Sequence, residues 1–161
     1  MYRKLLLLLF LILNFYGCNQ NKTDISFEKI TLYTSMCLGT CPIYHLEIDN
    51  DKQIKLFVEE FYIEESFEKD LSRIGYFTGK LSEKEFLSLM KLLESIDFNE
   101  SKTIENHCCD GSLKTISIYY NGKIKVIETM FPSEKTRAIV SFLIDVCEKD
   151  QLIKTNEKFV I

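Results

Sequence analysis

The chain has 161 residues, with 24 Asp and Glu against 20 Lys and Arg and 12% aromatic residues. This length predicts one domain, and the balance of apolar and charged residues is that of a globular protein, which excludes a disordered chain. The net charge of −4, with no cluster of basic residues, argues against binding to nucleic acid.

The first 17 residues are predicted to be an export signal. A basic start at Arg3 and Lys4 is followed by the apolar run 5–13, which is shorter than a membrane span requires. The next five residues, NFYGC, resemble the lipobox of bacterial lipoproteins, although Phe15 and Tyr16 stand where Leu and a small residue are commoner. An ordinary secretory signal and an uncleaved anchor are the alternatives.

The lipobox resemblance implies that Cys18 becomes the N-terminus and carries diacylglycerol on its sulfur and a fatty acid such as palmitate on its amine. One acyl chain anchors only marginally, whereas several hold a protein stably on a membrane. Residues 18–24 would be the lipidated cysteine with a polar tether. Because Asn19 is not Asp, resemblance to the enteric sorting rule favours the outer membrane, and we expect the domain to face the periplasm.

The alternation of apolar and polar residues predicts three strands at the start of the domain. Residues 25–34 form the first, with Ile30, Leu32 and Thr34 on one side. Residues 44–49 and 54–59 form a hairpin. Because the apolar residues of both strands must share a face, we expect a three-residue loop at 50–52.

A helix follows the first hairpin, and a second hairpin followed by a second helix repeats this pattern. Ser82 and Glu85 form a predicted capping box for a helix over 83–95. A second hairpin over 116–128 matches its apolar residues only if 121–123 is also a three-residue loop. A second helix follows Pro132 and runs to about residue 149. The predicted inward residues of the two helices are Phe86, Leu89, Met90, Leu93, Ile96, Ala138, Ile139, Phe142, Leu143 and Val146.

These elements predict a single α+β domain over 25–161. The sheet is antiparallel and consists of two β-hairpins plus a first strand, with two helices packed on one side in the order β-ββ-α-ββ-α. Three segments are less regular. Residues 61–79 are a loop or an extra strand pair, 99–114 are a connection, and the C-terminal 158–161 adds a strand or lies on the surface.

Five cysteines follow Cys18, and a structural role is the simplest interpretation. A Cys37–Cys41 bridge would clamp the loop between the first two strands, and a bridge from either one to Cys108 or Cys109 would tie the two halves together. Sequence alone does not choose between these pairings. Cys147 falls on or beside the inward face of the second helix, where it acts as a small buried apolar residue.

Two chemical alternatives remain for these cysteines. A set of soft ligands for zinc or copper(I) is available, although its spacing matches no strong zinc pattern: Cys37, Cys41, His107, Cys108 and Cys109. The string CLGTCP also matches the C-x-x-x-C-P of thioredoxin-fold copper chaperones, in which it opens a helix that activates the thiol. Here a strand follows Pro42, so the helix that would lower the thiol pKa is missing.

The motif C-x-G-x-C-P-x-Y at 37–44, followed by a hairpin and the run TGKLSEKEFLSLMKLLESIDF, resembles the domain of unknown function 6438 family. The resemblance runs from about residue 30 to 146. It implies an exported protein or lipoprotein and supplies no catalytic residue. Members often carry a D-x-P-like stretch where this chain has HCCDGS, so no shared role for residues 107–112 follows.

The remaining side chains point to binding more than to catalysis. We expect His45 on the polar face of a strand, and no Ser-His-Asp set or phosphate-binding loop is evident. Aromatic residues around the irregular segment form either an exposed binding patch or a loop packed on the core: Phe57, Phe61, Tyr62, Phe67, Tyr76 and Phe77.

The sequence therefore predicts a lipid-anchored envelope protein that binds or scaffolds an envelope protein partner without catalysis, cofactor or nucleic acid. The alternative is a soft-metal or thiol-redox protein that uses Cys37 and Cys41. A third class, an inhibitor of a secreted enzyme, rests only on the two hairpin–helix units.

Overall fold

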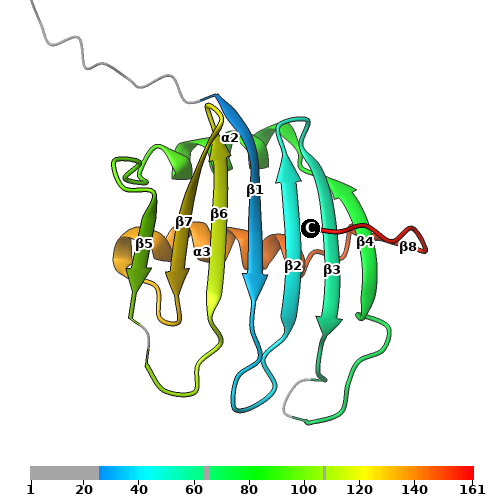
Figure 1. The fold of residues 1–161 in the computed structure, drawn as a ribbon. Coiled ribbons are helices and arrows are strands. Elements are labelled where there is room, and N and C mark those ends of the chain that lie inside the picture. The colour runs from blue at the N-terminus through cyan, green and yellow to red at the C-terminus, as the bar shows by residue number, and fades with distance from the viewer. Residues whose placement is uncertain (1–25, 64–65, 107) are drawn as a thin grey trace, which may run out of the picture.

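The computed structural model describes residues 26–63, 66–106 and 108–161. In this part of the chain one eight-stranded sheet, in the order β5-β7-β6-β1-β2-β3-β4-β8, has both helices on the same face (Figure 1). The elements are β1 (Phe27–Thr34), β2 (Ile43–Asp49), β3 (Gln53–Glu60), β4 (Gly75–Lys80), α2 (Glu83–Leu93), β5 (Lys102–Glu105), β6 (Lys114–Tyr120), β7 (Lys123–Thr129), α3 (Glu134–Cys147) and β8 (Ile153–Thr155).

The predicted α+β class and element order are confirmed, and three strands join the expected set. Strand β4 occupies the end of the irregular segment 61–79, and β5 lies inside the segment expected to be a connection. Strand β5 runs parallel to β7, so that edge of the sheet is not antiparallel. The C-terminal strand is β8, earlier in the chain than residues 158–161.

The first hairpin has the three-residue loop that the alternation predicts. Ile48 pairs with Ile54, which keeps the apolar residues of β2 and β3 on one face. Within the loop, Lys52 adopts a φ of 68° and donates its backbone N–H to the carbonyl of Asp49 at 3.0 Å. This is a tight turn followed by one left-handed residue, a common three-residue hairpin.

The prediction for the second hairpin is wrong. Tyr120 pairs directly with Lys123, so the loop has two residues, Asn121 and Gly122, with φ of 49° and 67°. This is the type I′ turn that Asn-Gly favours. The one-residue change in register turns Lys125 toward the helices and leaves Ile124 exposed on the other face.

Lys125 is only 1% exposed, and neighbouring oxygens explain how the register tolerates it. Its Nζ donates to the Glu100 carbonyl at 2.8 Å and to the Thr103 hydroxyl at 2.6 Å. Both acceptors belong to β5 or the residues just before it. Because a buried amine is costly only when it lacks partners, these two bonds offset the burial.

Helix α2 begins as predicted. Glu85 donates its backbone N–H to the Ser82 hydroxyl at 3.3 Å, and the Glu85 carboxylate accepts the Ser82 backbone N–H at 2.7 Å. Leu89 and Leu93 are the residues of this helix that are fully buried. On α3, Ile139, Leu143 and Val146 are buried as expected, but Ala138 is exposed and Val140 is buried in its place.

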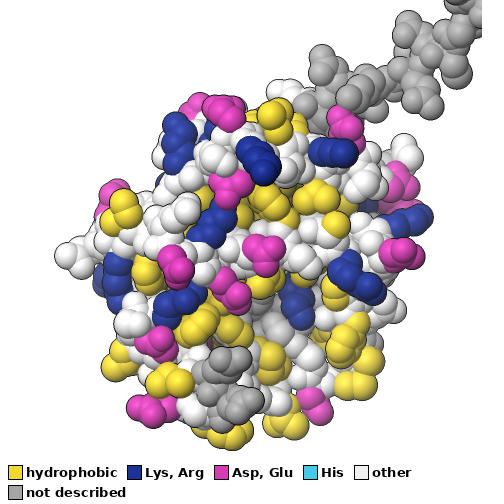
Figure 2. Space-filling model, turned by 180° about the vertical axis from the view of Figure 1, so that it is seen from behind, with side chains coloured by type: hydrophobic (Ala, Val, Ile, Leu, Met, Phe, Trp, Pro, Cys, Tyr) yellow, Lys and Arg dark blue, Asp and Glu magenta, His cyan; other side chains and the backbone are white. Residues whose placement is uncertain are grey.

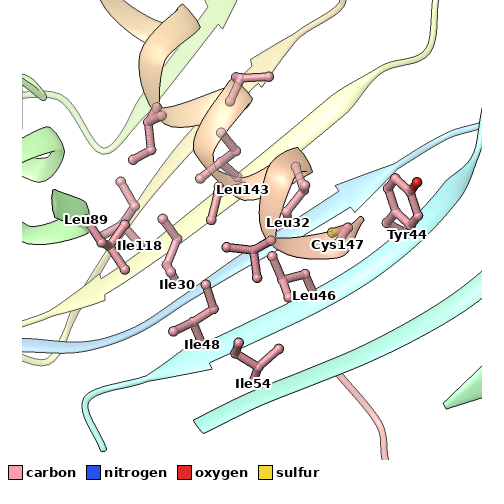
Figure 3. Close-up of a cluster of buried hydrophobic side chains, with 14 of the residues drawn as sticks. Ile30, Leu32, Tyr44, Leu46, Ile48, Ile54, Leu89, Ile118, Leu143 and Cys147 are labelled. Atoms are coloured by element: carbon pink, nitrogen blue, oxygen red, sulfur yellow. The ribbon is translucent and has the colours of Figure 1, made fainter. Parts of the chain in front are cut away.

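The core lies between the sheet and the two helices (Figure 3). Alternate residues of the central strands, Ile30, Leu32, Leu46, Ile48, Ile54 and Ile118, meet Leu89 of α2 and Leu143 of α3 there. Seen from the helix side, acidic and basic side chains are interspersed with small apolar patches (Figure 2). Neither helix of the described residues has the length and apolar character to cross a membrane.

Candidate functional site

The loop between β1 and β2 carries a disulfide between Cys37 and Cys41, whose Cα atoms are 5.7 Å apart. This is one of the pairings that the sequence left open. The base of the loop is also closed, because the Thr34 hydroxyl donates to the Pro42 carbonyl at 2.9 Å and accepts the Tyr44 backbone N–H at 2.8 Å. The disulfide closes the loop itself, and the two hydrogen bonds close its base.

The disulfide loop docks against the loop between β5 and β6. Leu38 donates its N–H to the Asp110 carbonyl at 3.1 Å, and Ser35 donates its N–H to the Leu113 carbonyl at 2.9 Å. The Ser112 hydroxyl donates to the Ser35 carbonyl at 2.7 Å. Backbone contacts therefore join the two halves of the domain here, without the covalent bridge that the sequence also allowed.

The three other described cysteines keep free thiols. Cys108 and Cys109 are exposed, and the hydrogen bond between their thiols raises the pKa of Cys108. Cys147 is buried, and burial raises the pKa of its thiol far above the usual range, which makes it the small apolar residue that the sequence predicts. His107, the remaining predicted metal ligand, lies outside the described residues.

Metal binding by cysteine requires thiolates, and a disulfide offers none. Cys37 and Cys41 are in that oxidised state in this structure. Within the described ranges, no group of three or more His, Cys, Asp or Glu side chains is arranged to hold a metal ion.

The tyrosine of the C-x-G-x-C-P-x-Y motif has a packing role. Tyr44 is 2% exposed, and its hydroxyl donates to a carboxylate oxygen of Glu148 at 3.2 Å, just past the end of α3. Burial, together with the negative charge of Glu148, raises the pKa of Tyr44 far above its ordinary value. This motif therefore joins β2 to the end of α3.

A second feature lies on the face of the sheet opposite α2 and α3, which neither of these described helices covers and which we call the open face (Figure 1). One side chain from each of four adjacent strands joins a continuous row of neighbouring rings: Tyr33 of β1, His45 of β2, Phe57 of β3 and Tyr76 of β4. Successive ring centroids are 5.0, 5.4 and 4.6 Å apart. We call these four residues the aromatic row.

Strand register places the aromatic row. Tyr33 pairs with His45, His45 with Phe57, and Phe57 with Tyr76, each pair directly opposite across neighbouring strands. In each of the first three strands, the residues on either side of the ring point to the helices and are buried. The rings stand on the opposite face, where Tyr33 is 40% exposed and the other three are half-buried.

Charges around the aromatic row are paired with one another. Glu47 accepts from Lys29 at 2.6 Å and from Lys55 at 3.4 Å, and the His45 ring lies 3.1 Å from a carboxylate oxygen of Glu59. Farther along the sheet, Lys102 pairs with Glu128 at 3.1 Å. The open face therefore presents aromatic surface between charged side chains that already have hydrogen-bonding partners.

Sequence reasoning found some of this surface. Of the aromatic residues flagged around segment 61–79, Phe57 and Tyr76 belong to the row, Phe61 and Phe77 pack against the core, and Phe67 is 83% exposed. His45 lies on the polar face as predicted, but its place between Tyr33 and Phe57 was missed. The sequence could have revealed this place, because the register of the first hairpin, which was predicted correctly, sets His45 opposite Phe57.

Comparison with protein families gives one match. The model of the domain of unknown function family DUF6438 matches residues 28–145. The chain belongs to this family. Neither a curated protein nor a solved structure matches the chain. The matched range contains the disulfide loop and the whole aromatic row, and it ends before β8.

Proposed function

We propose that this member of the family is a lipid-anchored binding module of the bacterial cell envelope, which holds a protein partner without catalysing a reaction. Its anchor is the acylated Cys18, its location is the periplasmic side of the outer membrane, and its binding surface is the open face of the sheet. The observation that carries the proposal is the aromatic row, four partly exposed neighbouring rings on the face that neither described helix covers.

Aromatic surface favours protein recognition for two reasons. Large rings release much water when they are covered, and they lose little conformational freedom, so Tyr and Trp are enriched among the strongest contacts in interfaces. On this face the nearby lysines already have acidic partners. A highly charged ligand would have to break these pairs, whereas an apolar or aromatic segment would leave them in place.

Two features support the proposed address. The leader resembles that of a lipoprotein, as described above. In addition, the loop disulfide suits an exported protein, because disulfides persist in oxidising compartments and are rare in the bacterial cytosol.

The anchor is tested by growing producing cells with an alkyne analogue of palmitate. The wild-type protein should take up the label and fractionate with the outer membrane. The Cys18→Ser variant should lose the label and become soluble in the periplasm. Label retained by Cys18→Ser, or wild-type protein in the cytosol, contradicts the proposed address.

The binding surface is tested by photo-crosslinking in living cells. A photoreactive amino acid replaces Tyr33, at the exposed end of the aromatic row. In a matched control it replaces Leu87, which is 67% exposed on α2. We expect a discrete protein adduct from position 33 and none of the same mass from position 87. No adduct from position 33, or the same adduct from both, would count against the proposal.

The second candidate function is soft-metal or thiol-redox chemistry, and the adjacent exposed thiols of Cys108 and Cys109 favour it. It requires Cys37 and Cys41 to be reduced in the cell. Intact mass before and after alkylation without reductant separates the two functions for Cys18→Ser protein made in a periplasm. Alkylation of Cys37 and Cys41, or a copper or zinc mass lost on denaturation, would favour the chemical function.

A further inference from the structure

The C-terminal segment, residues 156–161, returns from β8 across the open face of the sheet. Figure 1 shows it passing in front of β4 and β3, on the side opposite α3. The ring of Phe159 meets that of Tyr76 edge-on, with centroids 5.1 Å apart and planes at 81°. The chain therefore places one of its own aromatic residues at the end of the aromatic row.

The segment lies on the sheet as an extended strand would. Phe159 and Ile161 are partly buried, whereas Lys158 and Val160 are exposed, and Val160 is 97% exposed. Alternate side chains therefore turn toward the sheet and away from it, as they do in extended backbone. Residues 156–161 also lie outside the range that the family model matches.

Phe159 occupies one end of a longer site. The four rings of the aromatic row belong to four adjacent strands, so the row spans three strand spacings, roughly 14 Å. Phe159 contacts the ring of Tyr76 at the β4 end. Tyr33, at the β1 end, remains 40% exposed, and within the described residues the one ring that stacks on it is that of His45.

We propose that the aromatic row is the docking site for an extended segment of a partner protein that carries an aromatic side chain, and that residues 156–161 compete with it from within the chain. This inference rests on the proposed function and names the chemistry of the partner. Phe159 shows which side chain the row accepts, because an edge-on aromatic contact of this kind is a favourable geometry. The charged side chains near the aromatic row already have partners. The row would therefore recognise the backbone and the apolar side chains of the partner segment.

The internal segment is built to be displaced. It follows β8, a strand of only three residues at the edge of the sheet. Segments attached to short edge strands open at little cost, because few buried contacts hold them. Because the segment is tethered, it blocks its end of the row at high effective concentration, and a partner must bind more strongly to replace it.

The test uses a fluorescent peptide with the sequence of residues 154–161 as the probe. Its binding is measured to the full mature chain and to a chain that stops after Thr155. Removal of the internal competitor should tighten peptide binding by at least about tenfold. The same peptide with Phe159→Ala, or a shortened chain with Tyr76→Ala, should lose binding by a similar factor, whereas Leu87→Ala on α2 should leave it unchanged.

A full-length Phe159→Ala protein guards against misfolding of the shortened chain, because it keeps every backbone contact and should also bind the wild-type peptide more tightly. Peptide that binds none of these proteins, or binds equally after Tyr76→Ala, overturns the inference. Self-association of the full chain that Phe159→Ala abolishes also overturns it, because the occupant would then be a second copy. The crosslink from position 33 tests the proposed function separately, so a failure of the inference is distinguishable from a failure of the proposed function.

Discussion

The two faces of the sheet use the same strands for different purposes. The face toward α2 and α3 is closed and mostly aliphatic, with Ile30, Leu46 and Ile118 fully buried. The other face carries half-exposed rings and paired charges, and part of the chain's own C-terminus lies across it. Because side chains of a strand alternate, one sequence can place stability on one face and recognition on the other. The four predictions below test how cleanly they are separated.

The largest effect is expected on the closed face. Leu46→Ala should lower the free energy of unfolding by 2–5 kcal/mol, roughly the usual cost of a cavity in a packed core. Urea denaturation of wild type and variant measures it. A loss below about 1 kcal/mol, the range of a surface substitution, would show that this face is not the tightly packed core.

The disulfide should contribute less. Its closed loop has only five residues, and the chain-entropy relation gives about 2 kcal/mol for a loop of that size. The double variant Cys37→Ser, Cys41→Ser should therefore unfold at a lower urea concentration while it still gives the adduct from position 33. If the urea concentration of unfolding is unchanged, the disulfide does not stabilise the fold, and the soft-metal or thiol-redox function is favoured.

On the open face, the cost to stability should be smaller still. Phe57→Ala removes two ring contacts, with His45 and Tyr76, and should lower stability by about 1 kcal/mol. The same urea experiment measures this. A loss as large as that of Leu46→Ala would mean that the aromatic row belongs to the core. The two faces would then not divide stability and recognition between them.

The smallest effect concerns pH. The hydrogen bonds from Lys149 and Ser82 hold the pKa of Glu85 at about 2, below its ordinary 4.5. The folded state binds this proton less readily than the unfolded state, so the stabilisation is complete above pH 4.5 and disappears as the pH falls toward 2.

The Glu85→Gln variant is the matching measurement. This ion pair is partly exposed, so wild type and variant should differ by less than about 1 kcal/mol at neutral pH. The difference should vanish near pH 2. If the difference in free energy of unfolding stays constant between pH 7 and pH 2, it arises from packing instead of charge.

Alternation predicted the strands correctly where the buried face was apolar throughout. Ile30, Leu32, Ile48 and Ile54 all point to the helices, so the first hairpin and its loop followed directly. The same argument failed at Lys125, because the buried residue there is an amine. Its acceptors, Glu100 and Thr103, lie in or beside a strand that no periodic pattern revealed.

The candidate site was predicted in part for a related reason. The Cys37–Cys41 bridge was one of several pairings that the spacing allowed, and connectivity cannot be deduced from sequence alone. The aromatic row is a property of register across four strands. Tyr33 and Tyr76 are distant in the chain, and they join one row only when the register of β1 to β4 is known.

The central claim is that recognition resides on the open face. The most direct test is the yield of the adduct from position 33 in two alanine variants, Phe57→Ala in the aromatic row and Leu87→Ala on α2. The account predicts that Phe57→Ala abolishes the adduct while the protein remains folded and Leu87→Ala leaves the yield unchanged. An undiminished adduct with Phe57→Ala, or its loss with Leu87→Ala, would contradict it.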